Sequence, residues 1–304
     1  MELITGENDK GRRLDRILRK ALPDYPLPLI HRLLRQGKVF TDGKPAKAQD
    51  RQDSGVKITI HDFTNTFTNG QKNTQVKKRD LKLSQNESLL EILYSDRGLL
   101  AVNKPAGIEV HGDNSLETIV RSYLDKNLPP SLSFKPGPLH RLDKPSSGIV
   151  VFSSSLEGAQ LFSSLLQKQK VKKTYLAVVE GKIEKEEIWQ DKLVRDHDLK
   201  KTFISENSQS SSQEKTAITK ITPLKYIGNK NGGLTLIKAE IATGRTHQIR
   251  AQAAFHGFPL AGDKKYGGSN KQKKRFLLHA WKLEFAGIYI EAPLPQELKS
   301  LYSS

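Results

Sequence analysis

Apolar residues near the start of the chain recur at the spacing of an amphipathic helix. Leu14, Ile17, Leu18 and Ala21 occupy positions i, i+3, i+4 and i+7, so a helix over residues 11–21 would have one apolar face. Arginine and lysine fill most of the remaining positions. The pattern predicts a short helix that buries its apolar stripe and exposes a basic surface.

A second helical pattern follows, and short strand patterns come after it. Pro28 suits the first turn of a helix, and Gly37 suits the position after its last residue. Two basic helices followed by a hairpin predict a compact N-terminal module. The second helix would bury Ile30, Leu33 and Leu34. The strand patterns after it cover residues 39–41 and 56–60, and Asp42-Gly43 predicts a turn.

Strand patterns dominate the chain from residue 87 onward. Helical patterns are fewer there, and many strand patterns follow each other directly. This order favours an α+β domain with a mixed, mainly antiparallel sheet over a doubly wound fold. The predicted strands are 89–94, 99–103, 149–152, 174–179, 234–241, 276–285 and 288–291, and the predicted helices are 155–167 and 246–256.

Two polar stretches interrupt these patterns. Residues 61–86 are rich in Asn, Thr, Lys and Gln and have few apolar anchors, which predicts a linker. We therefore expect a small N-terminal module over 1–60, a linker over 61–86 and a larger domain over 87–304. Residues 196–215, with a run of Ser and Gln, predict a surface loop within the larger domain.

Composition narrows the classes of partner and site. The formal net charge is +17, and residues 10–60 alone hold 13 basic against 5 acidic residues, so a polyanion is the expected partner. The absence of cysteine excludes disulfides, thiolate metal sites and cysteine nucleophiles. No apolar run approaches the ~20 residues that cross a bilayer, and the first residues lack a secretory pattern, so we expect a cytoplasmic protein with no membrane partner.

A candidate catalytic carboxylate stands directly before a predicted buried strand. Asp143 lies in the segment His140-Arg141-Leu142-Asp143-Lys144, and an apolar strand begins at Ile149. Such a strand fixes the turn before it while leaving the side chain accessible. Because Arg141 and Lys144 flank it, Asp143 is expected to stay ionised, as a nucleophile requires. A structural Asp in a turn is the alternative.

Two further segments carry candidate chemistry. Tyr175 opens a predicted strand, where it could stack on a base while its hydroxyl takes a proton; a core aromatic is the alternative. In the segment 244–250, Thr246 suits a helix N-cap, which would place Arg250 on the same helical face as His247. A guanidinium there could pair with a buried carboxylate; a surface arginine is the alternative.

Together these segments resemble a known family. His140–Asp143 with Ser147-Gly148, the segment 173–181 and the segment 244–250 resemble, in order, the three signature motifs of the RluA family of RNA pseudouridine synthases. The segment 102–107 resembles the strand and turn that open the catalytic domain of that family. Ser146 stands where the family usually has Thr, and Ala251-Gln252 stand where it commonly has Val-His.

The resemblance implies roles for individual residues. Asp143 would be the catalytic aspartate, Tyr175 the tyrosine that stacks on the target base, and Arg250 the ion-pair partner of Asp143. Arg141 would enter the RNA helix when the uridine swings out, and Ile249 would wall the pocket. The other substrate-binding residues that it implies are His140, Arg245 and His247.

The N-terminal module has a resemblance of its own. The segments 13–18, 30–39 and 42–44 resemble the S4 RNA-binding domain. This implies that Arg32, Arg35 and Lys38 contact phosphates, whereas an ordinary solvated helix face is the alternative.

Cofactors and metals are not expected. The chain has no phosphate-binding loop, no dinucleotide fingerprint and no metal-binding pairing of its histidines, and uridine isomerisation involves no redox change. The expected substrate is structured RNA, most simply large-subunit ribosomal RNA, with transfer RNA as the alternative. A catalytically inactive RNA-binding assembly factor is a further alternative, and we expect a monomer.

Overall fold

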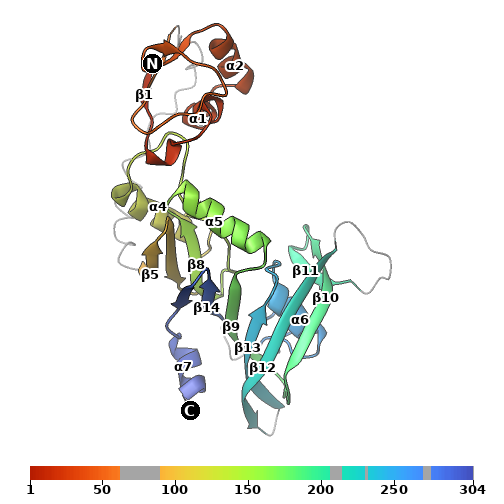
Figure 1. The fold of residues 1–304 in the computed structure, drawn as a ribbon. Helices are drawn as coiled ribbons and strands as arrows, with labels where there is room; N and C mark the ends of the chain where they lie inside the picture. Colours follow the sequence, from red (N-terminus) through yellow and green to blue (C-terminus); the bar gives the residue numbers. More distant parts are fainter. Residues whose placement is uncertain (62–89, 206–213, 230–231, 270–274, 304) are drawn as a thin grey trace.

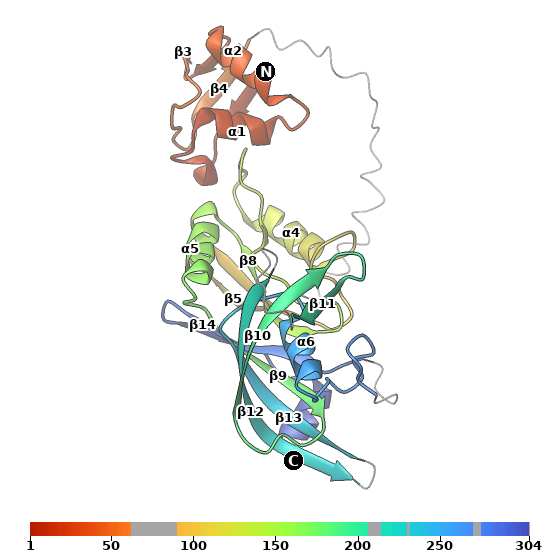
Figure 2. The same ribbon diagram turned by 90° about the vertical axis from the view of Figure 1, so that its right-hand side faces the viewer.

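The computed structural model describes residues 1–61, 90–205, 214–229, 232–269 and 275–303. These residues form a small N-terminal unit and a larger domain, stacked end to end (Figures 1 and 2). The predicted linker 61–86 lies almost entirely outside the described residues. No helix in the described ranges is both long and apolar enough to cross a membrane.

The N-terminal unit packs two helices on a small sheet. The sheet has the strand order β1-β4-β2-β3, and β1 was not predicted. The predicted apolar stripes are buried, since Leu14, Ile17 and Ile30 are each at most 2% exposed; each such side chain contributes about 1.5–3 kcal/mol to folding. The elements are β1 (Glu2–Ile4), the 3-10 helix η1 (Glu7–Asp9), α1 (Leu14–Ala21), α2 (Leu27–Arg35), β2 (Val39–Thr41), β3 (Lys44–Pro45) and β4 (Lys57–Ile60).

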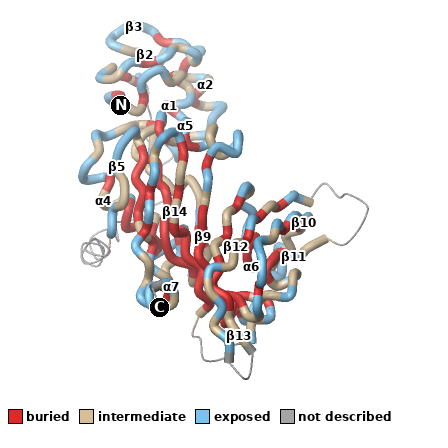
Figure 3. The backbone as a smooth tube through the Cα atoms, turned by 60° about the horizontal axis from the view of Figure 1, so that its bottom comes forward, coloured by how far each residue is buried: buried red, intermediate tan, exposed pale blue. Residues whose placement is uncertain are grey.

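The larger domain is built on one long sheet, which confirms the predicted α+β class. The path through the described strands is β11-β10-β12-β13-β9-β14-β8-β6-β5, with β15 beside β14 and β7 beside β8. The pair β14–β8 is parallel, and the other pairs are antiparallel. The central strands β9 and β14 run through the buried interior (Figure 3).

The bounds of these elements match most of the predicted segments. The strands β7, β10, β11 and β12, and the helices α4 and α7, were not predicted. The elements are β5 (Glu91–Asp96), β6 (Leu99–Lys104), α4 (Leu116–Asn127), β7 (Gly137–Pro138), β8 (Ser147–Ser153), α5 (Leu156–Gln167), β9 (Lys172–Glu180), β10 (Glu187–Asp196), β11 (Lys201–Ile204), β12 (Lys215–Asn229), β13 (Gly232–Ile241), α6 (Gln248–Phe255), β14 (Leu278–Phe285), β15 (Ile288–Glu291) and α7 (Gln296–Ser303).

The prediction of a surface loop over 196–215 was wrong in part. Residues 201–204 form strand β11, which pairs with β10. This pairing buries Thr202, whose backbone N–H donates to the hydroxyl of Tyr266 at 2.8 Å. The run of Ser and Gln at 206–213 lies outside the described residues.

A glycine allows the close approach of β8 and β14 at the centre of the sheet. Gly148 has φ +107°, and a Cβ atom there would lie 2.2 Å from the carbonyl oxygen of Ala280. A side chain at this position would therefore force the two strands apart. The loop that carries Asp143 comes directly before this close contact.

The N-terminal unit contacts the larger domain through a buried carboxylate. Asp9 is fully buried and accepts hydrogen bonds from Ser131 Oγ, from the backbone N–H of Leu132 and from the N–H and hydroxyl of Ser133. Burial opposes ionisation, but these donors outweigh it and lower the pKa of Asp9. A charged anchor thus joins the two parts of the chain.

Candidate active site

The loop that carries Asp143 is braced from strand β6. The backbone N–H of Ser146 donates to the carbonyl of Asp143 at 3.0 Å and closes the turn. Lys104, fully buried at the end of β6, donates its Nζ to three backbone carbonyls, including that of Lys144 at 3.2 Å. Burial lowers the pKa of Lys104 to about 8, against the opposing effect of Asp143. The backbone at Asp143 is therefore fixed before any ligand binds.

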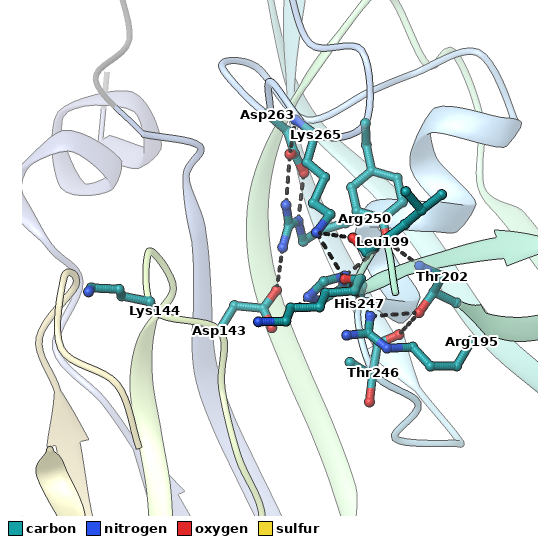
Figure 4. Close-up of polar contacts among 12 residues, drawn as sticks. Asp143, Lys144, Arg195, Leu199, Thr202, Thr246, His247, Arg250, Asp263 and Lys265 are labelled. Carbon is teal, nitrogen blue, oxygen red and sulfur yellow. Dashed lines mark hydrogen bonds and ion pairs between the residues drawn. The ribbon is translucent and has the colours of Figure 1, made fainter. Parts of the chain in front are cut away.

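Arg250 links the carboxylate of Asp143 to a second, buried carboxylate (Figure 4). Its Nη1 donates to Asp143 Oδ2 at 2.8 Å, and its Nε and Nη2 donate to the two oxygens of Asp263 at 2.7 and 2.8 Å. The guanidinium lies between the rings of Tyr266 and Phe276, 4.9 and 4.3 Å from their centroids. Burial opposes its charge, but the two aspartates outweigh this and raise the pKa of Arg250.

Of the cations expected to act on Asp143, Arg250 is its ion-pair partner, as predicted, whereas the flanking Arg141 and Lys144 are not. Lys144 pairs with Glu109 at 3.4 Å, and the side chain of Arg141 is exposed. Within the described part of the chain, the arginine that contacts Asp143 comes from α6, 107 positions away. Residues next to each other in a turn point in different directions, so the residues beside Asp143 in the sequence are not its ion-pair partners.

The other oxygen of Asp143 faces His247, whose ring is held by a hydrogen bond to Tyr266. His247 Nε2 lies 3.5 Å from Asp143 Oδ1, and its Nδ1 lies 2.9 Å from the hydroxyl of Tyr266. That hydroxyl accepts the N–H of Thr202. Arg195 Nη1, which can only donate, also lies 3.5 Å from Nδ1, so Nδ1 is an acceptor and the hydroxyl donates its proton to it. The neutral ring then carries its hydrogen on Nε2, facing Asp143. Burial lowers the pKa of His247 to about 4, although Asp143 opposes this.

The prediction that Thr246 caps helix α6 was wrong. The N-cap is His247, which has φ 55° and no side-chain capping bond. The side chain of Gln248 orders the turn instead, because its Oε1 accepts from Thr243 Oγ1 at 2.8 Å and from the N–H of Arg245 at 3.1 Å. The left-handed backbone at His247 turns its ring toward Asp143 beside Arg250 (Figure 4).

Tyr175 and Asp143 line the same pair of adjoining cavities. The larger has a volume of about 520 Å³, and a smaller one of about 70 Å³ continues from it toward Ile249 and Arg250. Burial, and then the charge of Asp143, raise the pKa of Tyr175, so its phenol stays protonated. No hydrogen bond of that hydroxyl is found among the described residues. The space beside Asp143 can therefore take a planar polar group.

The other predicted substrate-binding residues surround these cavities. Arg141, Arg245 and His247 line both, and Ile249 lines the smaller one. His140 lines the larger one, but its Nε2 accepts the N–H of Val151 at 3.1 Å. Burial lowers the pKa of His140 to about 3. Its ring is thus a neutral part of the cavity wall.

The predicted phosphate contacts of the N-terminal module lie apart from this site. Arg32 and Arg35 are exposed on α2, and Lys38 follows that helix. None of the three lines either cavity, and α2 lies at the far end of the N-terminal unit (Figure 1). No group of three or more possible metal ligands is found in the described ranges.

Sequence reasoning did not assign roles to several residues that hold the site. Asp263 and Tyr266 follow the third motif, and Lys104 lies in the segment resembling the opening of the domain, so their proximity to recognised motifs was the available signal. Thr202 gave no signal, because its backbone N–H acts only through the approach of β11 to Tyr266.

Solved structures identify the class of fold. The chain superposes on "Human RNA Pseudouridylate Synthase Domain Containing 1" with a TM-score of 0.57 and 24% identity, over 70% of this chain and 86% of that one. For "Human RNA Pseudouridylate Synthase Domain Containing 4" the TM-score is 0.59 and the identity 20%, over 72% and 95%. The larger domain therefore has the pseudouridine synthase fold.

Relatives in sequence identify the family. The family model described as RNA pseudouridylate synthase matches residues 98–255. "Ribosomal large subunit pseudouridine synthase C" of Pasteurella multocida is 30% identical over 98% of this chain and 92% of its own length, and "Ribosomal large subunit pseudouridine synthase D" of Nitrosomonas europaea is 30% identical over 99% and 86%. The chain belongs to the RNA pseudouridylate synthase family and is a pseudouridine synthase. The resemblance of its catalytic domain to the RluA family is confirmed.

Proposed function

We propose that this enzyme isomerises specific uridines of large-subunit ribosomal RNA, with Asp143 as its catalytic aspartate. The observation that carries the proposal is the carboxylate of Asp143, which lines a cavity and has Arg250 on one oxygen and His247 on the other. The ribosomal substrate is supported by the names of the relatives that align along almost the whole chain.

The reaction suits a single positioned carboxylate. Isomerisation breaks the N1–C1′ bond of uridine, rotates the freed uracil and joins C5 to C1′. C5 then loses its proton and N1 gains one, so the composition is unchanged. The carboxylate can act at C1′, at C6 or on the 2′-proton, and in each case it must be ionised. The ion pair with Arg250 holds this carboxylate in place at the cavity.

Neighbouring residues would receive the everted base. Leaving the stack costs a few kcal/mol, and base-flipping enzymes offset this cost with contacts in a fitted pocket. Tyr175 would stack on the uracil while Ile249 packs beside it. Arg141, exposed at the rim, would take the place of the base in the RNA helix.

The N-terminal unit would add affinity without taking part in the chemistry. Residues 1–60 would act as an S4-like RNA-binding domain, with Arg32, Arg35 and Lys38 on phosphates. Such contacts strengthen binding to any sequence and weaken as salt rises. This fits a large folded substrate, which reaches the cavity and the distant basic helix together.

Mapping of modified positions tests the proposal. Pseudouridines in total RNA are mapped in cells with and without the protein, and in cells lacking it that carry either the wild type or Asp143→Asn. We expect one or a few positions of large-subunit RNA to lose the modification, and only the wild type to restore them. Loss confined to transfer RNA would overturn the ribosomal substrate, and restoration by the variant would overturn the role of Asp143.

A further inference from the structure

A second groove adjoins the catalytic cavity. It has a volume of about 570 Å³, and the turn Gly244–Thr246 lines both the groove and the larger catalytic cavity. The rest of its lining comes from the strands at one end of the sheet, through Leu193, Arg195, His197, Thr202 and Lys215. The two spaces are therefore neighbours across a single turn.

Strand register places the groove's side chains on one face. Leu193 is opposite Lys215 and Arg195 is opposite Thr202, so the four side chains point to the same side of the sheet. Leu193 is buried and forms part of the floor.

The hairpin that carries this face is fastened at its tip. Lys265 donates its Nζ to the carbonyls of Leu199 and Lys200 at 3.1 and 2.9 Å (Figure 4). Lys265 follows Asp263, which binds Arg250. The groove and the catalytic ion pair are thus held by the same segment.

The groove carries positive charge that no carboxylate of the described residues neutralises. Arg195, Lys215 and Arg245 line it, and within the described part of the chain none of them has an acidic partner within 4.0 Å. No Asp or Glu is among its described lining residues. Arg195 is oriented by neutral partners, with its Nη1 3.5 Å from both Thr202 Oγ1 and His247 Nδ1.

Two lysines elsewhere on the same sheet are paired with glutamates. Lys220, also on β12, lies 3.0 Å from Glu186, and Lys238 lies 3.5 Å from Glu240. A solvated surface would be expected to mix charges in this way throughout. The groove departs from that pattern at the place where it meets the catalytic cavity.

We propose that this groove binds the phosphate backbone of the RNA strand immediately next to the target uridine. The inference rests on the proposed function, because a base everted into the catalytic cavity leaves its own strand at the Gly244–Thr246 turn. A strand passing over that turn brings its next phosphates to Arg195, Lys215 and Arg245. An exposed cation on a phosphate releases condensed counterions and positions the strand without reading its sequence.

Substitution of Lys215 tests the groove with a matched control. Lys215→Gln is compared with Lys220→Gln, since both lysines are exposed on β12 and face opposite sides of the sheet. The affinity for a target RNA hairpin is measured over a range of salt concentrations. We expect Lys215→Gln to weaken binding several-fold and to reduce the slope of log affinity against log salt by about 0.7, the value for one single-stranded phosphate contact. Lys215→Arg should restore the slope, and Lys220→Gln should leave it unchanged.

Truncated RNAs locate the phosphate. Oligonucleotides that end at the target uridine on its 5′ or its 3′ side are bound to the wild type and to Lys215→Gln. One truncation should abolish the difference between the two proteins, because it removes the strand from the groove. A difference that survives both truncations, or an unchanged salt slope in Lys215→Gln, would overturn the inference.

The same assays separate this inference from the proposed function. With saturating RNA, the control Lys220→Gln should form pseudouridine at the wild-type rate, whereas Lys215→Gln should need a higher RNA concentration to reach half of its maximum rate. Inorganic phosphate at concentrations that leave the ionic strength constant should not compete with RNA; specific competition would show a free-anion site instead. If the wild type converts its target but Lys215→Gln binds like the wild type, only the groove assignment fails.

Discussion

The two oxygens of Asp143 have different partners, and each partner comes with its own support. Arg250 is fixed on Oδ2 by the buried Asp263, and His247 faces Oδ1 because Tyr266 holds its ring. Rigid placement of a reacting carboxylate lowers the cost of reaching the transition state. Tyr266 is therefore a positioning residue that acts through His247.

Removing one oxygen atom tests this relay. Tyr266→Phe keeps the ring over Arg250 but removes the closer partner of His247 Nδ1, which leaves only Arg195 Nη1 at 3.5 Å, so the imidazole is held less firmly. We expect kcat to fall about 5–30-fold, the equivalent of one hydrogen bond of about 1–2 kcal/mol, while RNA affinity stays unchanged. Single-turnover rates at saturating RNA measure this.

An exposed tyrosine supplies the control for that change. Tyr289 lies on β15, away from the lining of both cavities, and Tyr289→Phe should react at the wild-type rate. An unchanged kcat in Tyr266→Phe would show that the orientation of His247 does not matter. A loss of RNA binding without a loss of rate would assign Tyr266 to the substrate instead.

Sequence motifs were sufficient to choose the candidate catalytic residues but not to describe how they are held. Asp143, Tyr175 and Arg250 were chosen by resemblance, and the structure brings the aspartate and the arginine into contact. Asp263, the second carboxylate that binds Arg250, could not be chosen, because its role depends on the packing of a loop against α6. The same applies to Thr202, whose function lies in its backbone.

At the scale of elements, strand β8 is joined to its surroundings by neutral histidines. His140 Nε2 accepts the N–H of Val151, and His279 on β14 shares a hydrogen bond of 2.9 Å with the hydroxyl of Ser147. Burial lowers the pKa of His140 to about 3 and that of His279 to about 4. A protonated His140 would place a donor against a donor, so the fold requires the neutral ring.

Acid should therefore destabilise the enzyme well above the range of ordinary carboxylates. The unfolded chain takes up protons on these histidines near pH 6.5, while the folded chain does not until about pH 4 or below. Stability is then highest above pH 6.5 and falls as the pH drops through that window, by up to about 1.4 kcal/mol per pH unit for each histidine. Urea unfolding between pH 7.5 and pH 4.5 measures the slope.

Histidine variants check the source of this slope. His140→Gln supplies a neutral acceptor and should make the slope shallower, whereas His197→Gln, at an exposed position, should not. A stability that stays flat from pH 7.5 to 4.5 would contradict neutral burial of these rings.

The more completely a strand is buried among apolar neighbours, the more accurately its position was predicted from the sequence. The central strands β6, β8 and β9 are continuous apolar runs and were predicted nearly to their ends. The strands β10, β11 and β12 were missed because their polar residues find partners inside the fold. The hydroxyl of Thr219, for example, donates to Gln252 Oε1 at 2.6 Å. The polar residues of these strands indicated a solvent-exposed segment, whereas hydrogen bonds to distant parts of the chain allow them to be buried.

At the scale of the whole molecule, one carboxylate orients the N-terminal unit. Asp9 receives donors from residues 131–133, and Asn8 Oδ1 accepts the N–H of Leu156 at the start of α5. The basic helices therefore keep a set position relative to the catalytic domain. An RNA that contacts both parts would be presented to the cavity at a fixed distance from α2.

Loss of this anchor should loosen the junction. Asp9→Ala leaves the donors of Leu132 and Ser133 without an acceptor, at a cost of about 2–4 kcal/mol. We expect faster proteolysis between the two parts and a lower free energy of unfolding, with turnover of a minimal RNA hairpin unchanged. Asp24→Ala, at an exposed position on the same unit, is the control. Equal protease resistance in both variants would show that the contact does not hold the parts together.

Removal of the N-terminal unit tests its contribution to binding. Deletion of residues 1–60 should weaken RNA binding and flatten its salt dependence, because the proposed phosphate contacts of the basic module would be lost. Titration of the truncated and full-length proteins at several salt concentrations measures both effects. An unchanged salt slope would refute the proposed role of the module.

The central claim concerns one carboxylate, and the most direct measurement is the single-turnover yield of Asp143→Asn with a target RNA, beside its affinity for the same RNA. The asparagine keeps the shape of the side chain and can still meet Arg250, but it cannot act as a carboxylate. The account predicts that the variant binds the RNA and forms no pseudouridine. Product formed at the wild-type rate would contradict it.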